Sequence, residues 1–96
     1  MSNLIIFQDF MRKERLFSKF NLLKIGIFGS FARDEQNAQN IDILIDNENI
    51  QPEKLIELKS IIEESFGKKV DIVLAKYANP IILYRAKKDL KYATKY

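Results

Sequence analysis

A chain of 96 residues is long enough for one compact domain and too short for two, so residues 1–96 are expected to form a single domain. Hydrophobic residues make up 47% and charged residues 30% of the chain, which is typical of a folded domain and argues against disorder. Cysteine and histidine are both absent, which excludes disulfides, thiolate metal sites, Ser-His-Asp triads and zinc hydrolase sites. Any chemistry would therefore be carried by carboxylates and a metal ion.

The net charge of +3 is small but unevenly distributed, because the segment from Tyr84 onward carries +4 and the rest of the chain −1. Such a basic segment can contact nucleic acid or an acidic partner, and it can equally be a solvated surface. The sequence disfavours direct nucleic-acid binding, since it lacks aromatic residues interleaved on strands as in single-strand binders. No signal peptide and no apolar run of membrane-spanning length is visible, so a cytoplasmic protein without membrane contact is expected.

The first predicted element is an amphipathic helix from Asn3 to about Lys19, with Ser2 or Asn3 as its N-cap. Apolar side chains recur there at spacings of three and four residues and should pack in the core (Leu4, Phe7, Phe10 or Met11, and Phe17). A strand is predicted from Leu22 to Phe28. It is apolar on both faces, including Leu23, which is typical of a strand covered on both sides.

Gly29 and Ser30 should open a short turn of helix, and a polar loop follows. The next strand, Ile41 to Asp46, alternates cleanly: its isoleucines face one side and Asp42 faces the other, with Asn40 one step before on the aspartate side.

The second half of the chain predicts a turn from Asn47 to Gln51 and a helix from Pro52 to Gly67. A third strand from Lys69 to Leu74 carries Asp71. A last helix should start at Asn79-Pro80 and run to about Lys88, and the ending from Asp89 to Thr94 is either an edge strand or frayed. The predicted fold is α/β (α+β), with a small mixed sheet of three to four strands and packed helices.

A candidate site follows from three features taken together, since each alone is a weak signal. They are the Gly29-Ser30 turn after the first strand, Asp42 early on the second strand and Asp71 early on the third. Glycine lets the backbone approach a ligand, and free N–H groups at a helix start favour phosphate. Because adjacent strands lie about 4.8 Å apart, Asp42 and Asp71 could share one cation that binds phosphate oxygens.

These residues also carry a family resemblance. The runs FGSFAR, NIDILI and FGKKVDIV resemble the minimal nucleotidyltransferases of the DNA polymerase beta superfamily, and the similarity extends from about Leu4 to Tyr92. Such small proteins are commonly encoded beside a HEPN-domain partner as toxin–antitoxin pairs. The resemblance implies transfer of a nucleoside monophosphate, AMP by preference, from Mg²⁺-bound ATP or another NTP to a hydroxyl. In antitoxin members the acceptor can be a tyrosine of the HEPN toxin.

Carried onto this chain, the resemblance makes Gly29 and Ser30 the triphosphate-binding turn and Arg33 a structural or phosphate-side residue. It makes Asp42 a metal ligand, and Asp71 the third carboxylate, which binds metal and helps to activate the attacking hydroxyl. In the family these carboxylates bind two Mg²⁺ ions.

Two departures from the family pattern bear on activity. Asn40 stands where the first metal-binding aspartate is expected, after a loop one residue short, and it offers a carbonyl ligand without charge. Asp34 stands where the family usually has glycine. Two hypotheses follow: an active nucleotidyltransferase impaired by Asn40, or an inactive nucleotide-binding antitoxin that neutralises its partner by complex formation.

The remaining features have more ordinary interpretations. All four tyrosines lie in the last twenty residues; we expect Tyr84 to pack on the core, and leave open whether the others pack or form an interface. Lys68 and Lys69 most simply complement the dipole of the preceding helix. A domain this small also makes a homo- or hetero-oligomer plausible.

Overall fold

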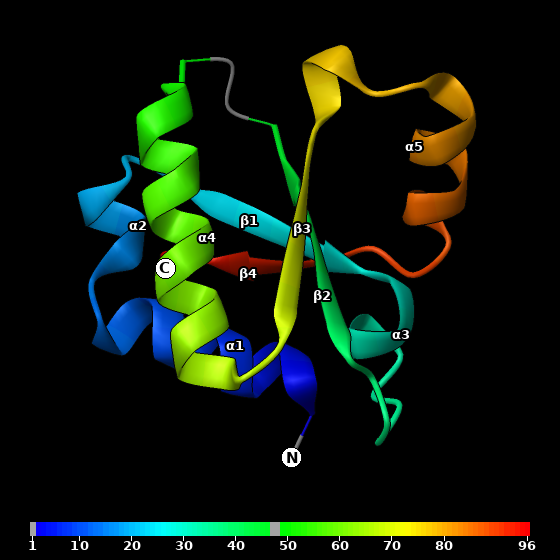
Figure 1. Ribbon diagram of the computed structural model, residues 1–96, viewed down its shortest axis with the longest axis horizontal. Coiled ribbons are helices and arrows are strands. Elements are labelled where there is room, and N and C mark those ends of the chain that lie inside the picture. The colour runs from blue at the N-terminus through cyan, green and yellow to red at the C-terminus, as the bar shows by residue number, and fades with distance from the viewer. Residues whose placement is uncertain (1, 47–48) are drawn as a thin grey trace.

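A four-stranded mixed sheet forms the centre of the computed structural model, which describes residues 2–46 and 49–96 (Figure 1). Strand β1 (Lys24–Phe28) pairs antiparallel with both β2 (Asn40–Ile45) and β4 (Lys91–Thr94). Strand β2 pairs parallel with β3 (Lys69–Leu74), so the strand order is β3-β2-β1-β4. The predicted fold class is confirmed, and the ending of the chain is an edge strand.

The parallel pair β2–β3 depends on a crossover through helix α4 (Pro52–Phe66), because parallel neighbours cannot be joined by a tight turn. As predicted, α4 starts with Pro52 in its first turn and ends at Gly67, whose φ of 62° is left-handed. The turn predicted from Asn47 to Gln51 lies partly outside the described residues.

The N-terminal segment forms two helices, α1 (Asn3–Lys13) and α2 (Leu16–Lys19), and the prediction of one continuous helix is wrong. Arg15 between them has a left-handed φ of 57°, which interrupts the helix. The apolar spacing continued across the break because Met11 before it and Phe17 after it both reach the same core. Ser2 caps α1, as expected, by accepting a hydrogen bond from the Ile5 amide.

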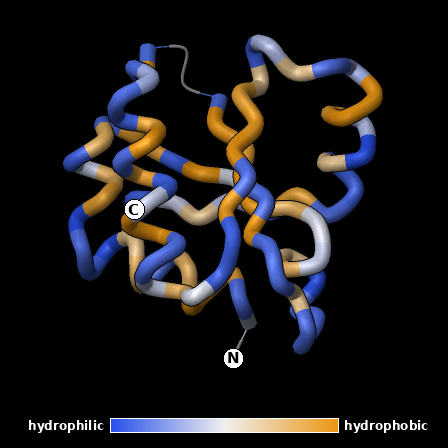
Figure 2. Tube along the Cα trace, viewed as in Figure 1, coloured by the Kyte–Doolittle hydropathy of each residue, from blue (hydrophilic) through white to orange (hydrophobic). Residues whose placement is uncertain are grey.

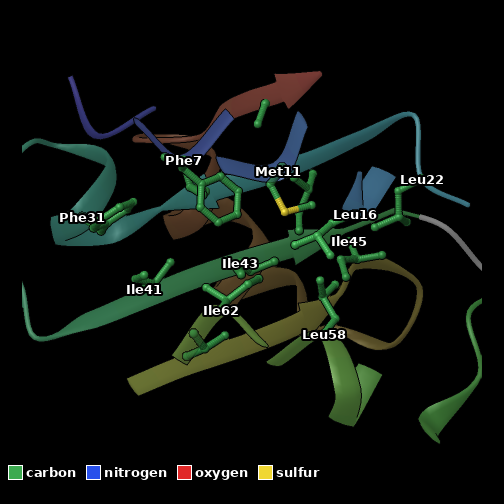
Figure 3. Packing of buried hydrophobic residues seen from close by; sticks show 14 of the residues in the cluster. Phe7, Met11, Leu16, Leu22, Phe31, Ile41, Ile43, Ile45, Leu58 and Ile62 are labelled. Atoms are coloured by element: carbon green, nitrogen blue, oxygen red, sulfur yellow. The ribbon is translucent and has the colours of Figure 1, made fainter. Parts of the chain in front are cut away.

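The hydrophobic core lies between one face of the sheet and helices α1, α2 and α4 (Figure 3). The isoleucines of β2 meet the buried stripes of α1 and α4 there, as the alternation predicted (Phe7, Met11, Ile41, Ile43, Ile45, Leu58 and Ile62). Figure 2 shows hydrophilic residues at the beginnings of β2 and β3 and hydrophobic ones in their second halves. The polar strand beginnings therefore lie toward one end of the sheet.

Helix α3 (Gly29–Ala32) packs Phe31 and Ala32 into the same core, whereas the short helix η1 (Ala75–Tyr77) and α5 (Pro80–Lys87) follow β3 and bury only Ala86. In Figure 1, α5 lies on the opposite side of β2 and β3 from α4. Asn79 caps α5, since its side-chain oxygen accepts a hydrogen bond from the Ile81 amide at 2.8 Å. No helix among the described residues combines the length and apolarity that crossing a bilayer requires.

Two packing predictions are wrong. Leu23 precedes β1 and is 71% exposed, because the chain leaves the left-handed Asn21 in a turn and β1 starts only at Lys24. Tyr84 is 67% exposed, because it lies on the outer side of α5, where Lys88 covers its ring. Tyr77 and Tyr96 are also exposed, and the Tyr92 hydroxyl donates to Asp46.

Candidate active site

The corner between β1 and α3 brings the backbone against a carboxylate. Phe28, the last residue of β1, is paired with Asp42 on β2, so Gly29 begins α3 beside that aspartate. Gly29 has a φ of +71°, and a Cβ built there would lie 2.4 Å from Asp42 Oδ2. A side chain at position 29 would therefore displace the carboxylate as well as strain the backbone.

Asp42 and Asp71 are direct partners in the parallel ladder, so their side chains lie side by side on one face of the sheet. Asp42 is half-buried and Asp71 is exposed. Burial raises the pKa of Asp42, the negative charge of Asp71 raises it further, and the positive charge of Arg33 opposes both effects. A cation bound between the two carboxylates would relieve this repulsion.

Asn40 lies on the same face as Asp42, two residues earlier, and its partner across the ladder is Lys69. Within residues 2–46 and 49–96, no three His, Cys, Asp or Glu side chains are grouped as a metal site. The two neighbouring carboxylates plus the amide oxygen of Asn40 nevertheless form an oxygen donor set of the type that Mg²⁺ accepts, with less charge than three carboxylates would supply.

Arg33, at the end of α3, makes two short ion pairs. Its Nε donates to Glu35 Oε2 at 2.6 Å, and its Nη1 donates to Asp89 Oδ2, beyond α5, also at 2.6 Å. These bonds raise the pKa of the guanidinium. Ser30 follows Gly29 in α3 but does not line the neighbouring pocket.

A pocket of about 370 Å³ opens between this corner and α5. Three of its lining residues, Gly29, Arg33 and Asp42, were predicted from the sequence, whereas the wall that faces them was missed. Four of the missed residues lie along α5 and just beyond it (Ile82, Arg85, Ala86 and Asp89). Their spacing of three to four residues is that of one helix face and was the available signal.

Two charged residues near the site have local partners. Asp34 has a left-handed φ of 62°, which fits a position where the family resemblance implies glycine. Its carboxylate accepts a hydrogen bond of 2.8 Å from the backbone N–H of Asn3, at the start of α1. The same carboxylate lies 3.9 Å from Lys91 Nζ. Lys68 donates to the Ala38 carbonyl and so joins the loop before β2 to the start of β3.

Comparisons with known proteins identify the family of this chain. The family model "Polymerase beta, Nucleotidyltransferase" matches residues 13–92. A Methanocaldococcus jannaschii protein named "Putative protein adenylyltransferase MJ1217" is 38% identical over 97 residues, covering 96% of this chain and 99% of the relative. The protein adenylyltransferase MntA of Thermococcus cleftensis is 39% identical over 64 residues, which is 65% of each chain.

Solved structures show the same fold. A toxin-antitoxin crystal structure with AMP-PNP aligns with a TM-score of 0.68 and 20% identity, covering 85% of this chain and 69% of that one. A mutant of the toxin-antitoxin MntA-HpeT aligns with a TM-score of 0.63 and 19% identity, covering 83% and 66%. The family model matches most of this chain, and a relative is 38% identical over nearly the whole chain. The chain therefore belongs to the polymerase beta nucleotidyltransferase family.

Proposed function

We propose that this chain is a cytoplasmic protein adenylyltransferase that acts as the antitoxin of a HEPN-domain toxin. It transfers AMP from Mg²⁺-bound ATP to a hydroxyl of that toxin, a tyrosine by analogy with antitoxin members of the family. Relatives named as protein adenylyltransferases support the reaction, and the toxin-antitoxin structures support the partner. The observation that carries the proposal is the contact of the Gly29 corner with Asp42, which has Asp71 in register beside it.

The reaction forms a bond between the acceptor oxygen and the α-phosphorus, while the bond from that phosphorus to the bridging oxygen breaks and pyrophosphate leaves. Asp71 is exposed, so it is accessible to the incoming hydroxyl and takes its proton. Asp42, Asp71 and the carbonyl of Asn40 would hold Mg²⁺, which supplies charge neutralisation for the phosphates when bound. Gly29 and Ser30 offer backbone N–H groups of the first turn of α3 to the triphosphate.

A second candidate is an inactive antitoxin that binds nucleotide and neutralises the toxin by covering it. Asn40 favours this alternative, because an uncharged ligand beside two carboxylates weakens divalent-cation binding next to a triphosphate.

Incubation of the chain with its HEPN partner, Mg²⁺ and ATP labelled on the α-phosphate distinguishes the two. The adenylyltransferase predicts label on the toxin, loss of label with Asp71→Asn, and faster labelling with Asn40→Asp, which restores the third carboxylate. A stable complex that neutralises the toxin without labelling it, even with Asn40→Asp, would support the inactive antitoxin. If the toxin were not labelled and no complex formed, both candidate functions would be contradicted.

A further inference from the structure

The two arginines that line the active-site pocket are in different states. Arg33 is held by Glu35 and Asp89 through hydrogen bonds of 2.6 Å each. Arg85 lines the same pocket and is exposed, and its side chain makes no hydrogen bond or ion pair within residues 2–46 and 49–96. Arg85 is therefore the arginine with all its side-chain donors available to a ligand.

The position of Arg85 depends on its neighbours on and beyond α5. Ala86 is buried against the sheet, and Asp89 just beyond the helix is bound by Arg33. Asn79 caps the start of the helix. Arg85 thus lies between Asn79, which stabilises the start of α5, and Asp89, which joins the end of the helix to α3, and it lines the pocket together with Gly29 and Asp42.

The charges of the residues around the Gly29 corner favour a cation at the place of Arg85. Arg33 with its two acidic partners amounts to −1, and Asp42 with Asp71 contributes a further −2. One divalent cation would cancel the charge of the two carboxylates. The negative charge of the triphosphate itself, and that of the group formed by Arg33 and its two acidic partners, would remain without a positive counterpart. A guanidinium relieves this because it is always charged and donates bidentate hydrogen bonds to phosphate.

The geometry also indicates which phosphates Arg85 meets. Asp71, where the acceptor hydroxyl is activated, does not line the pocket, whereas Asp42 does, so the pocket extends from Asp42 toward α5. In phosphoryl chemistry of this kind the attacking and leaving oxygens lie roughly in line on opposite sides of the phosphorus. An acceptor at Asp71 therefore places the leaving pyrophosphate in the pocket beside α5.

We propose that Arg85 is the residue that binds the β- and γ-phosphates and holds pyrophosphate as it leaves, whereas Arg33 is a structural clamp between α3 and the end of α5. This assignment rests on the proposed nucleotidyltransferase function of the site and names the leaving-group subsite within it.

Equilibrium binding of fluorescent mant-ATP and mant-AMP to the full chain, with Mg²⁺, tests the assignment. Arg85→Ala should weaken mant-ATP binding about 10- to 100-fold, the loss expected for a charge-assisted hydrogen bond, and leave mant-AMP binding within about twofold. The inhibition constant of inorganic pyrophosphate, calculated from displacement of mant-ATP with the Kd of each variant, should be lower for the original chain than for Arg85→Ala. Arg85→Lys should restore part of the affinity, because it keeps the charge and loses the bidentate geometry.

Lys87→Ala is the matched control, because Lys87 is an exposed cation on the same helix that does not line the pocket. It should bind both nucleotides like the original chain, and circular dichroism should show all variants folded. Unchanged mant-ATP affinity in Arg85→Ala, or equal losses for mant-ATP and mant-AMP, would overturn the assignment. If the original chain bound neither nucleotide, the proposed function itself would fail, which is a different outcome.

Discussion

Gly29 shows how much of the site depends on a single residue without a side chain. From the sequence, the predicted role of this glycine was to let the backbone come close to a phosphate. The structure adds a second reason, since the space that a Cβ would fill is already occupied by the carboxylate of Asp42. The same position thus sets both the backbone conformation and the placement of a candidate metal ligand.

Gly29→Ala should abolish AMP transfer and lower the free energy of unfolding by about 1–2 kcal/mol, the cost of a left-handed non-glycine residue. Gly67→Ala is the matched control, because Gly67 has a similar φ of +62° but no atom within 4 Å of the place that a Cβ would take. It should lose similar stability and keep transfer. Thermal unfolding and the labelled-ATP assay measure both effects, and equal transfer by the two variants would contradict a special role for position 29.

Asp42 makes a prediction about pH, because its pKa is raised above the ordinary value of 3.8 by burial and by the charge of Asp71. The folded state then binds this proton more tightly than the unfolded chain, so the stabilisation is present below about pH 3.8 and is lost as pH rises through the folded-state pKa. At neutral pH the ionised carboxylate destabilises the fold.

Asp42→Asn should accordingly raise the Tm at pH 7 in buffer with EDTA, and the gain should shrink as the pH is lowered toward 4. Asp9→Asn, which removes an exposed carboxylate on α1 outside the pocket, is the control for the loss of one negative charge. Melting curves from pH 4 to 8 provide the measurement; a lower Tm for Asp42→Asn at pH 7 would show that the carboxylate is stabilising after all.

At the scale of elements, α4 and α5 are attached to the sheet very differently. Helix α4 buries Leu58 and Ile62 in the core. Helix α5, all of whose residues are described, buries only Ala86 and exposes Ile81 and Tyr84. Its attachment therefore depends on Ala86 and on the Arg33–Asp89 ion pair, while the Asn79 cap stabilises the start of the helix itself.

Removal of a cap should for this reason have different effects in α5 and in α1. Asn79→Ala should fray α5 and weaken ATP binding, since Arg85 lies on that helix; Ser2→Ala removes the corresponding cap of α1 and should leave ATP binding unchanged. Each change should cost about 1 kcal/mol of helix stability. Amide hydrogen exchange along α5, measured together with mant-ATP affinity, checks the effect, and unchanged affinity despite faster exchange in α5 would separate the helix from the binding site.

At the scale of the molecule, the sheet register brings distant residues into one site. The alternation in β2 and the apolar pattern of β3 were sufficient to place Asp42 and Asp71 on corresponding faces, and the parallel ladder makes them partners. The pairing of β4 with β1 and the α5 wall could not be predicted, because both are set by tertiary contacts between segments with little local signal. The break at Arg15 escaped the periodicity for a similar reason, since both helices contact one core.

The stability of this small domain should depend on the core side of α4. Ile62→Ala should lower the free energy of unfolding by about 2–5 kcal/mol, a large part of the about 5–15 kcal/mol of a typical domain. Ile56→Ala, on the same helix but with Ile56 70% exposed, should change it by less than about 0.5 kcal/mol. Urea denaturation compares the two, and similar losses would mean that α4 packs differently in solution.

The unequal attachment of the two helices has a consequence for selectivity. One side of the pocket is formed by the sheet and the Gly29 corner, while the other lies on α5, which is held to the rest of the molecule by Ala86 and by the Arg33–Asp89 ion pair. The width of such a pocket can adjust by small movements of the α5 side at little cost in core packing. Ligands of slightly different width should then fit the pocket, with the wall that carries Arg85 as the side that moves.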